Sequence, residues 1–238
     1  AAGRYGNGDV QWMTAGGGVQ HSEMFPLIHE DKENPMELFQ IWLNLPAKNK
    51  MVKPHFKMLW GDTIPKYKPN ENVVVEVIAG KLENHVAPAP PPDSWASDPS
   101  NEVMILNIKM QAGETWTLPA ASTGINRTLY FYEGTQLHIN GTSIPGYHAV
   151  TVEPDMNLVL ENGADACSIL VLQGKPINEP VIQYGPFVMN TKEEIIKAFD
   201  DYHATQFGGW PWPNSDQVHD RASGRFALHA DGTKEVKS

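Results

Sequence analysis

The chain has 238 residues, a formal net charge of −10 and a hydrophobic content of 41%. This length allows one or two domains with a real core, and the acidic balance argues against direct binding to nucleic acid, which requires clustered Lys and Arg. The only cysteine, Cys167, excludes a disulfide framework and a thiolate metal site, and no apolar run approaches the ~18–20 residues that span a bilayer. We therefore expect a cytoplasmic monomer that contacts neither membrane nor nucleic acid directly.

The stretch from Gly8 to Pro26 predicts two short strands, 10–14 and 19–24, joined by a flexible glycine turn. Side chains alternate along a strand, so His21 and Glu23 share one face, with their Cα atoms about 6–7 Å apart. An imidazole nitrogen and a carboxylate oxygen placed in this way can bind one divalent metal, and such a mixed set suits Fe(II) and its first-row neighbours. The bare pattern is also typical of a half-buried polar strand.

Residues 25–35 form a polar loop bounded by prolines, and Met36–Leu45 then predicts a buried strand with a bulge near Leu38. The aromatic residues on this strand, Phe39 and Trp42, either pack in the core or line a ligand cavity. A linker rich in proline and lysine follows. We place a domain boundary near Pro69.

The second half of the chain predicts a series of short strands with turn residues between them, among them two Asn-Gly pairs. After a β-branched strand at 73–79, seven further strands recur at intervals typical of a closed β-sandwich or barrel. They are 103–110, 115–118, 127–133, 135–139, 148–152, 157–161 and 166–173. His138 and His148 fall on different strands of this series, and we interpret them as structural.

From Thr191 the period becomes helical. Thr191 and Glu194 form a capping-box pattern, and Ile195, Phe199 and Tyr202 fall on one face of a helix that ends near residue 203. The prolines of 210–213 exclude a helix there, and we expect this Trp-Pro-Trp-Pro segment to pack across the surface of a barrel.

Several of these segments together resemble the pirin family of bicupins. They are Gly-Asp-Val-Gln-Trp-Met-Thr-Ala-Gly followed by His-Ser-Glu-Met, Leu-Phe-Gln-Ile-Trp-Leu-Asn-Leu-Pro, Gly-Pro-Phe-Val-Met-Asn-Thr and Thr-Gln-Phe-Gly-Gly-Trp-Pro-Trp-Pro. The resemblance implies an all-β fold, a bicupin of two double-stranded β-helix (jelly-roll) barrels, the first incomplete, plus a short C-terminal helix. We expect residues 1–68 to be the remainder of the metal-site barrel, 69–190 a metal-free barrel, and 191–238 a helix and tail packed on the barrels.

The same resemblance implies that His21 and Glu23 are two of four protein ligands to a non-haem metal, Fe(II) or another divalent first-row ion. In the family the other two ligands are a His-x-His pair on an earlier strand, and this sequence contains no His-x-His. We therefore expect the chain to lack the N-terminal part of a pirin and to be inactive by itself.

Two classes of function follow from the resemblance. In the first, the full-length protein is a quercetin 2,3-dioxygenase-type oxidoreductase for a flavonol or similar small aromatic substrate, and Glu23 is catalytic because it accepts the proton of the substrate hydroxyl. In the second, it is a metal-dependent transcriptional co-regulator that binds a protein partner without turnover. A cupin scaffold with an unrelated substrate is the third interpretation.

Overall fold

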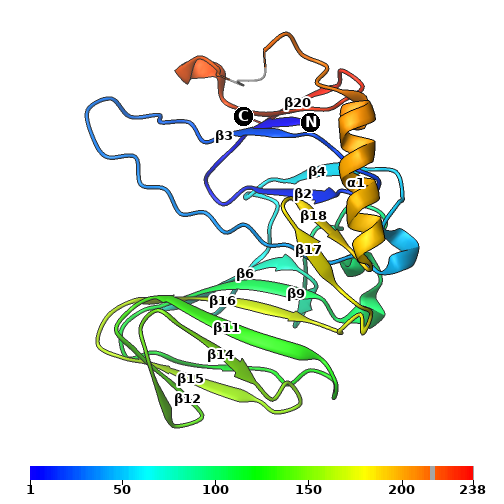
Figure 1. Cartoon of the computed structure of the whole chain (residues 1–238). Coiled ribbons are helices and arrows are strands. Elements are labelled where there is room, and N and C mark those ends of the chain that lie inside the picture. Colours follow the sequence, from blue (N-terminus) through cyan, green and yellow to red (C-terminus); the bar gives the residue numbers. More distant parts are fainter. Residues whose placement is uncertain (215–217, 238) are drawn as a thin grey trace. The chain divides into compact units, whose positions relative to one another are not determined.

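A computed structural model describes residues 1–214 and 218–237 of the chain (Figure 1). Strands dominate these residues, together with one α-helix, α1 (Lys192–Thr205), and five short 3-10 helices. This composition confirms the all-β fold class. The chain forms two compact units, of which the first comprises Ala1–Asp62, Pro91–Trp95 and Ile177–Ser238 and the second Thr63–Pro90 and Ala96–Pro176. The domain limits expected at residues 68 and 190 stay predictions.

The second unit contains a six-stranded and a four-stranded sheet. The first has the order β14-β11-β16-β9-β6-β5, and its strands are β5 (Lys66–Asn70), β6 (Val73–Ala79), β9 (Met104–Met110), β11 (Asn126–Glu133), β14 (His148–Val152) and β16 (Cys167–Gly174). The second has the order β10-β15-β12-β13, with β10 (Thr115–Leu118), β12 (Gln136–Ile139), β13 (Thr142–Pro145) and β15 (Leu158–Asn162). A small ribbon pairs β7 (Lys81–Leu82) with β8 (His85–Val86), and η3 (Pro99–Asn101) precedes β9.

Alternation of apolar and polar residues explains the core of this unit. In β6, Val73, Val75 and Val77 are fully buried, while the residues between them are only partly buried. Both sheets contribute to one hydrophobic cluster, which includes Leu106 of the larger sheet and Leu160 of the smaller one. The predicted strand 73–79 and the seven strands after it are confirmed to within one residue at each end.

Four strands of the second unit were not expected from the sequence, namely the short β7 and β8 and the longer β5 and β13. Residues 66–70 were interpreted as a linker, but they form β5, an edge strand whose pairing with β6 is irregular between Tyr67 and Asn70. Pro69 lies in this irregular part, where an edge strand tolerates a residue that lacks an N–H donor. The hairpin partner of β12, β13, was missed because its residues are mostly exposed and carry little apolar signal.

The first unit is built from ladders between segments that are far apart in the sequence. One sheet has the order β20-β19-β1-β3 and unites β1 (Ala2–Arg4), β3 (Ser22–Met24), β19 (Arg225–Leu228) and β20 (Lys234–Lys237), so both ends of the chain lie in it (Figure 1). Two ribbons complete the strands, β2 (Val10–Thr14) with β4 (His55–Leu59) and β17 (Ile182–Tyr184) with β18 (Phe187–Met189). The short helices of this unit are η1 (Ala47–Asn49), η4 (Gln206–Gly208) and η5 (Arg221–Ser223). A further short helix, η2 (Trp95–Ser97), begins at Trp95, where the Pro91–Trp95 segment of the first unit ends.

The strand predicted at 10–14 is confirmed as β2, and of the strand predicted at 19–24 only β3 (Ser22–Met24) forms, but the two do not pair with each other. Strand β2 pairs with β4 in an antiparallel ladder, and β3 pairs with β1 in a parallel one. The glycine turn between them contacts other parts of the unit. The N–H of Gly17 donates to the Val52 carbonyl at 2.9 Å, and a Cβ on Gly18 would lie 2.5 Å from the Phe207 ring. Long-range pairing therefore overrides the local turn signal.

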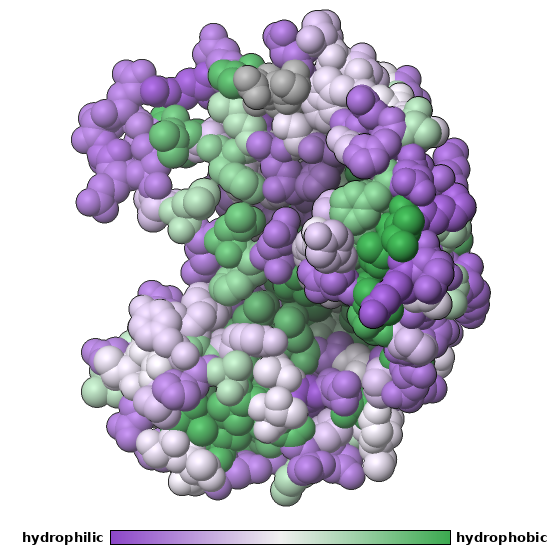
Figure 2. Space-filling model, viewed as in Figure 1, coloured by the Kyte–Doolittle hydropathy of each residue, from purple (hydrophilic) through white to green (hydrophobic). Residues whose placement is uncertain are grey.

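The buried strand expected at 36–45 is also wrong. These residues form no strand, and Met36, Phe39 and Trp42 are exposed. The chain between β3 and η1 leaves the sheet as a long loop (Figure 1), and the segment that projects there in the space-filling view mixes hydrophilic with hydrophobic residues (Figure 2). Apolar alternation alone does not make a strand, because the backbone also needs a ladder partner. The loop ends where the buried Lys50 amine donates to the Leu45 carbonyl and the Asn44 side chain.

The predicted helix is confirmed, including its start. The Thr191 hydroxyl accepts from the Glu194 N–H at 3.2 Å, and the Glu194 carboxylate accepts from the Thr191 N–H at 2.9 Å. Its apolar face packs on the neighbouring ribbon, with the Phe199 and Phe187 rings 4.8 Å apart. In the tail, Trp210 and Trp212 contact each other edge-to-face, and their expected packing across a barrel stays a prediction.

Candidate metal and ligand site

The site predicted from the sequence lies at the edge strand β3. Its partner β1 runs parallel to it, with Gly3 opposite Glu23 and Ser22 opposite Ala2. The Ser22 N–H donates to the Ala1 carbonyl at 3.1 Å, and His21 stands one residue before the strand. Pairing with β1 therefore fixes the backbone from which the Glu23 side chain projects.

The structure brings the two predicted ligands together. Nδ1 of His21 lies 3.4 Å from Oε1 of Glu23, and the two side chains keep 31% and 23% of their surface exposed. An imidazole and a carboxylate in contact, both reachable from solvent, are the donor types that bind a divalent first-row metal. The shared face inferred from strand periodicity is thus observed, although their assignment as metal ligands stays a prediction.

A residue near this pair that the sequence did not indicate is Tyr5. Its side chain is 7% exposed, and its ring meets the Phe25 ring edge-to-face, with the two centroids 5.2 Å apart. Burial raises the pKa of Tyr5, and the negative charge of the Glu23 carboxylate raises it further. Only knowledge of the β1–β3 register could have placed Tyr5 near Glu23.

A second residue missed by the sequence analysis is Gln11, on β2. Both polar atoms of its amide are buried, and neither has a hydrogen-bond partner within residues 1–214 and 218–237. A Cβ built on Gly3 would lie 3.1 Å from Nε2 of Gln11 and 3.2 Å from the Tyr5 ring. Gly3, the ladder partner of Glu23, therefore leaves room for both side chains.

A buried ion pair joins distant segments of the first unit. The Asp9 side chain is fully buried, and its Oδ1 lies 2.6 Å from NH1 of Arg225 on β19. The same carboxylate accepts from the N–H groups of Gly6 and Gly61, at 3.1 and 2.8 Å. Arg225 also lies over the Trp60 ring, 5.8 Å from its centroid. Asp9 thus connects the turn after β1 to Arg225 on β19 and to Gly61, two residues after the end of β4.

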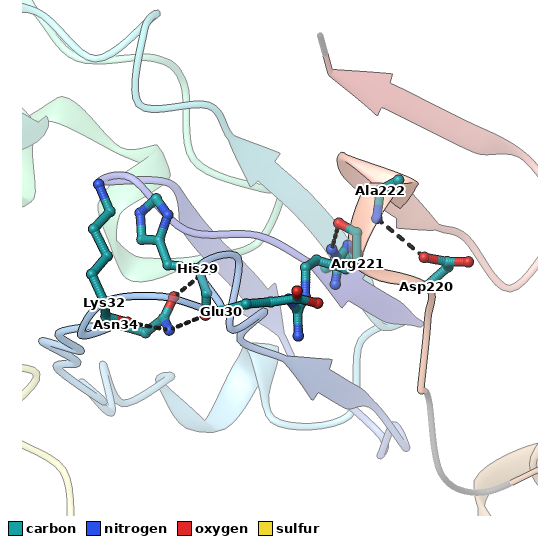
Figure 3. A network of polar contacts seen from close by, with 8 residues as sticks. His29, Glu30, Lys32, Asn34, Asp220, Arg221 and Ala222 are labelled. Atoms are coloured by element: carbon teal, nitrogen blue, oxygen red, sulfur yellow. Dashed lines mark hydrogen bonds and ion pairs between the residues drawn. The ribbon is translucent and has the colours of Figure 1, made fainter.

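Arg4, on β1, connects the site at β3 to the C-terminal segment of the chain. Its guanidinium is buried and donates to the carbonyls of Gly224 and Arg221, each at 2.7 Å, and contacts the Met24 sulfur at 3.8 Å. Arg221 in turn forms an ion pair with Glu30, in the loop after β3 (Figure 3). Strand β1, the ladder partner of β3, and the loop after β3 are therefore both held by η5.

The donor types at this site, an imidazole nitrogen and a carboxylate oxygen, fit a non-haem metal ion. His21 and Glu23 offer one nitrogen and one oxygen, and the described part of the chain contains no cluster of three or more His, Cys, Asp or Glu side chains that could hold an ion. Held by a metal, these residues would supply two donors of its coordination sphere. In the second unit, His138 lies on β12 and His148 on β14, in different sheets. The expectation that this unit is metal-free stays a prediction.

Over residues 1–214 and 218–237, no helix combines the length and the apolar character that crossing a membrane requires.

Comparison with known proteins gives matches over most of the chain. The family model described as Pirin matches residues 1–43, and the model described as Pirin C-terminal cupin domain matches residues 105–208. Pirin-1 of Arabidopsis thaliana is 37% identical over 84% of this chain and 66% of its own length. A pirin-like protein of Caulobacter vibrioides is 34% identical over 85% of this chain and 68% of its own length. A solved structure titled quercetin 2,3-dioxygenase, from Acinetobacter baumannii, is 26% identical, with a TM-score of 0.66, over 85% of this chain and 67% of that one.

The chain spans 65–66% of the length of the first three curated relatives that it matches. Those matches cover 82–84% of this chain.

Proposed function

The chain belongs to the pirin family of cupin proteins, and from this premise we propose that it contributes the metal site of a quercetin 2,3-dioxygenase-type oxidoreductase. In this proposal His21 and Glu23 are two of the protein ligands of a divalent first-row metal, Fe(II) first among them. The substrate is a flavonol, whose hydroxyl and carbonyl oxygens are adjacent.

The observation that carries the proposal is the contact between the two donors. Nδ1 of His21 and Oε1 of Glu23 lie 3.4 Å apart at an accessible edge strand, and the motif that contains them lies within the residues matched by the Pirin model. A solved relative is titled quercetin 2,3-dioxygenase, which supports this reaction class over the co-regulator alternative.

Held by these donors, the metal would supply Lewis-acid and redox chemistry toward O₂. Glu23 accepts the proton of the flavonol hydroxyl as general base. A carboxylate has about four lone-pair sites, so the contact with His21 leaves it acceptor capacity. The partial exposure of both donors gives a small planar ligand access to them.

Oxygen uptake with quercetin tests the proposal on the iron-loaded full-length protein. We expect quercetin-dependent uptake, and we expect His21→Ala to reduce it by more than the roughly 10–100-fold that loss of an outer hydrogen-bond partner costs. The control is His29→Ala, because His29 lies in the loop after β3 and bonds to Asn34 through its backbone. Absence of uptake by the iron-loaded wild type would contradict the enzymatic proposal.

A further inference from the structure

The chain leaves the end of α1 in a strained backbone conformation. Gln206 and Phe207 have φ values of 47° and 51°, in the left-handed region that favours glycine. Two such residues in succession, one of them aromatic, are held there only where the surrounding structure determines their conformation. The contacts that these two residues make therefore explain why the strain is kept.

Both residues contact the segment that leads into His21. The Gln206 carbonyl accepts a hydrogen bond from Nε2 of Gln20 at 2.7 Å. The Phe207 ring packs on Gly18, where a Cβ would lie 2.5 Å from two of the ring carbons. The left-handed turn thus directs a carbonyl group and an aromatic ring onto the glycine turn and the residue just before His21.

The Phe207 ring is also held from its other sides. Its centroid lies 5.3 Å from that of Tyr202 on α1, and 5.9 Å from that of Phe187 on β18, which it meets edge-to-face. The Phe207 N–H donates to the Thr205 hydroxyl at 3.1 Å. Because α1 and β18 fix the ring, the position of Gly18 is determined by the end of the helix.

The backbone on both sides of His21 is bonded to Ala1, just before β1. The Gln20 carbonyl accepts from the Ala1 nitrogen at 3.1 Å, and the Ser22 N–H donates to the Ala1 carbonyl at the same distance. His21 itself lies outside the ladder of β3. The direction from which the chain enters His21 therefore depends on Gln20 and on the glycine turn before it.

We propose that Gln206 and Phe207 form a clamp that positions His21 for metal binding and couples the end of α1 to the site at β3. This inference rests on the proposed function, in which His21 is a ligand. A ligand whose backbone is fixed before the metal arrives loses less conformational entropy on binding. The strain at the end of α1 is then accounted for, since strain of this kind clusters at ligand sites.

Titration with Co(II) tests the proposal on the full-length protein, because the visible absorption of bound Co(II) reports the arrangement of its ligands. Phe207→Gly removes the ring but leaves a residue that adopts the left-handed conformation without strain. We expect it to weaken Co(II) binding by about tenfold, the lower end of the roughly 10–100-fold that loss of an outer partner costs, and to change the spectrum. Gln20→Met, which loses the hydrogen bond to the Gln206 carbonyl, should act in the same direction.

Two further variants separate the clamp from the backbone strain. The matched control is Tyr147→Gly, which also removes an aromatic side chain at a positive φ, 60°, but from a position in the second unit where the residue is 86% exposed. Gln206→Gly relieves strain at the clamp but keeps the carbonyl and the Phe207 ring. Both variants should bind Co(II) with wild-type affinity and spectrum.

Hydrogen exchange of the metal-free protein separates this inference from the proposed function. The N–H groups of Gly17 and Gly18 donate to the carbonyls of Val52 and Ala15, at 2.9 and 3.0 Å. Phe207→Gly should lose protection at these two amides, because the clamp no longer holds the glycine turn, whereas Tyr147→Gly should keep it.

Unchanged protection in Phe207→Gly, or unchanged Co(II) affinity in that variant, would overturn the proposal while leaving the proposed function in place. If the wild type takes up no Co(II), the proposed function fails and the positioning role of the clamp fails with it. Lost protection in Phe207→Gly would then show that the clamp serves the fold alone.

Discussion

Removal of the Asp9 carboxylate should destabilise the first unit more than any surface charge change. Asp9 is fully buried and lies 2.6 Å from the Arg225 guanidinium. It also accepts hydrogen bonds from two backbone N–H groups, those of Gly6 and Gly61. In Asp9→Ala, the guanidinium and both N–H groups lose their acceptor at once.

The size of the expected loss in the free energy of unfolding follows from burial. Breaking a buried ion pair by removing one partner costs about 3–5 kcal/mol, because the remaining charge stays desolvated without compensation. An exposed pair contributes about 0.3–0.5 kcal/mol when it joins residues i and i+4 of a helix. Lys197 and Asp201 form such a pair on α1, also at 2.6 Å, but with 66% and 37% of their side-chain surface exposed. The distance is therefore matched between the two pairs, whereas burial and the two backbone hydrogen bonds to Asp9 differ.

Urea unfolding followed by tryptophan fluorescence measures both changes, because Trp60 contacts the buried pair. We expect Asp9→Ala to lower the free energy of unfolding by about 3–5 kcal/mol and Asp201→Ala by under about 0.5 kcal/mol. Arg225→Met in the Asp9→Ala background should restore part of the loss, since it removes the uncompensated charge. Equal losses for Asp9→Ala and Asp201→Ala would refute the reasoning.

Three further changes test other features of the chain. Gln11→Met should raise the free energy of unfolding by about 1–3 kcal/mol, because it removes a buried amide without partners. The control Gln20→Met, which loses a 2.7 Å hydrogen bond to a backbone carbonyl, should lower the free energy of unfolding. A loss of stability in both variants would contradict the assignment of the Gln11 amide as buried and unpaired. Gly18→Ala should lower the free energy of unfolding by about 2–5 kcal/mol, because it combines a positive φ of 119° with a Cβ 2.5 Å from the Phe207 ring. In a double-mutant cycle, Phe207→Ala should restore part of this stability. Strictly additive losses would exclude a clash between the new methyl group and the ring. Burial raises the pKa of Cys167 to about 11, so its protonated thiol stabilises the fold fully below the unfolded-state pKa of about 8.5, and this contribution is lost as pH rises through 11. The wild type should therefore lose more stability than Cys167→Ala between pH 8 and 11 in unfolding experiments, and parallel pH profiles would contradict this.

Most strands of the second unit could be predicted from the sequence, since their signals are local. Val73 to Val77 alternate between buried and partly buried positions, and an Asn-Gly turn at residues 140–141 joins β12 to β13. The capping box at Thr191 is similarly local and was predicted correctly. In each case, residues close in sequence carry the information that determines the structure.

The first unit could not be predicted in this way, because its ladders join distant segments. Nothing near Val10 indicates that its strand pairs with one that ends at Leu59, and nothing near Gly3 indicates that Glu23 lies opposite it. The shared face of His21 and Glu23 was predictable, since it depends only on the period of a strand. The proximity of Tyr5 to Glu23 was not predictable, because it requires the register between β1 and β3.

Metal stoichiometry of the full-length protein is the most direct test of the central claim. After loading with Fe(II) without oxygen and removal of free metal, the wild type and His29→Ala should each retain close to one equivalent of iron, measured by elemental analysis. His21→Ala and Glu23→Ala should retain almost none. Equal iron retention by all four proteins would show that the imidazole and the carboxylate at β3 are not ligands.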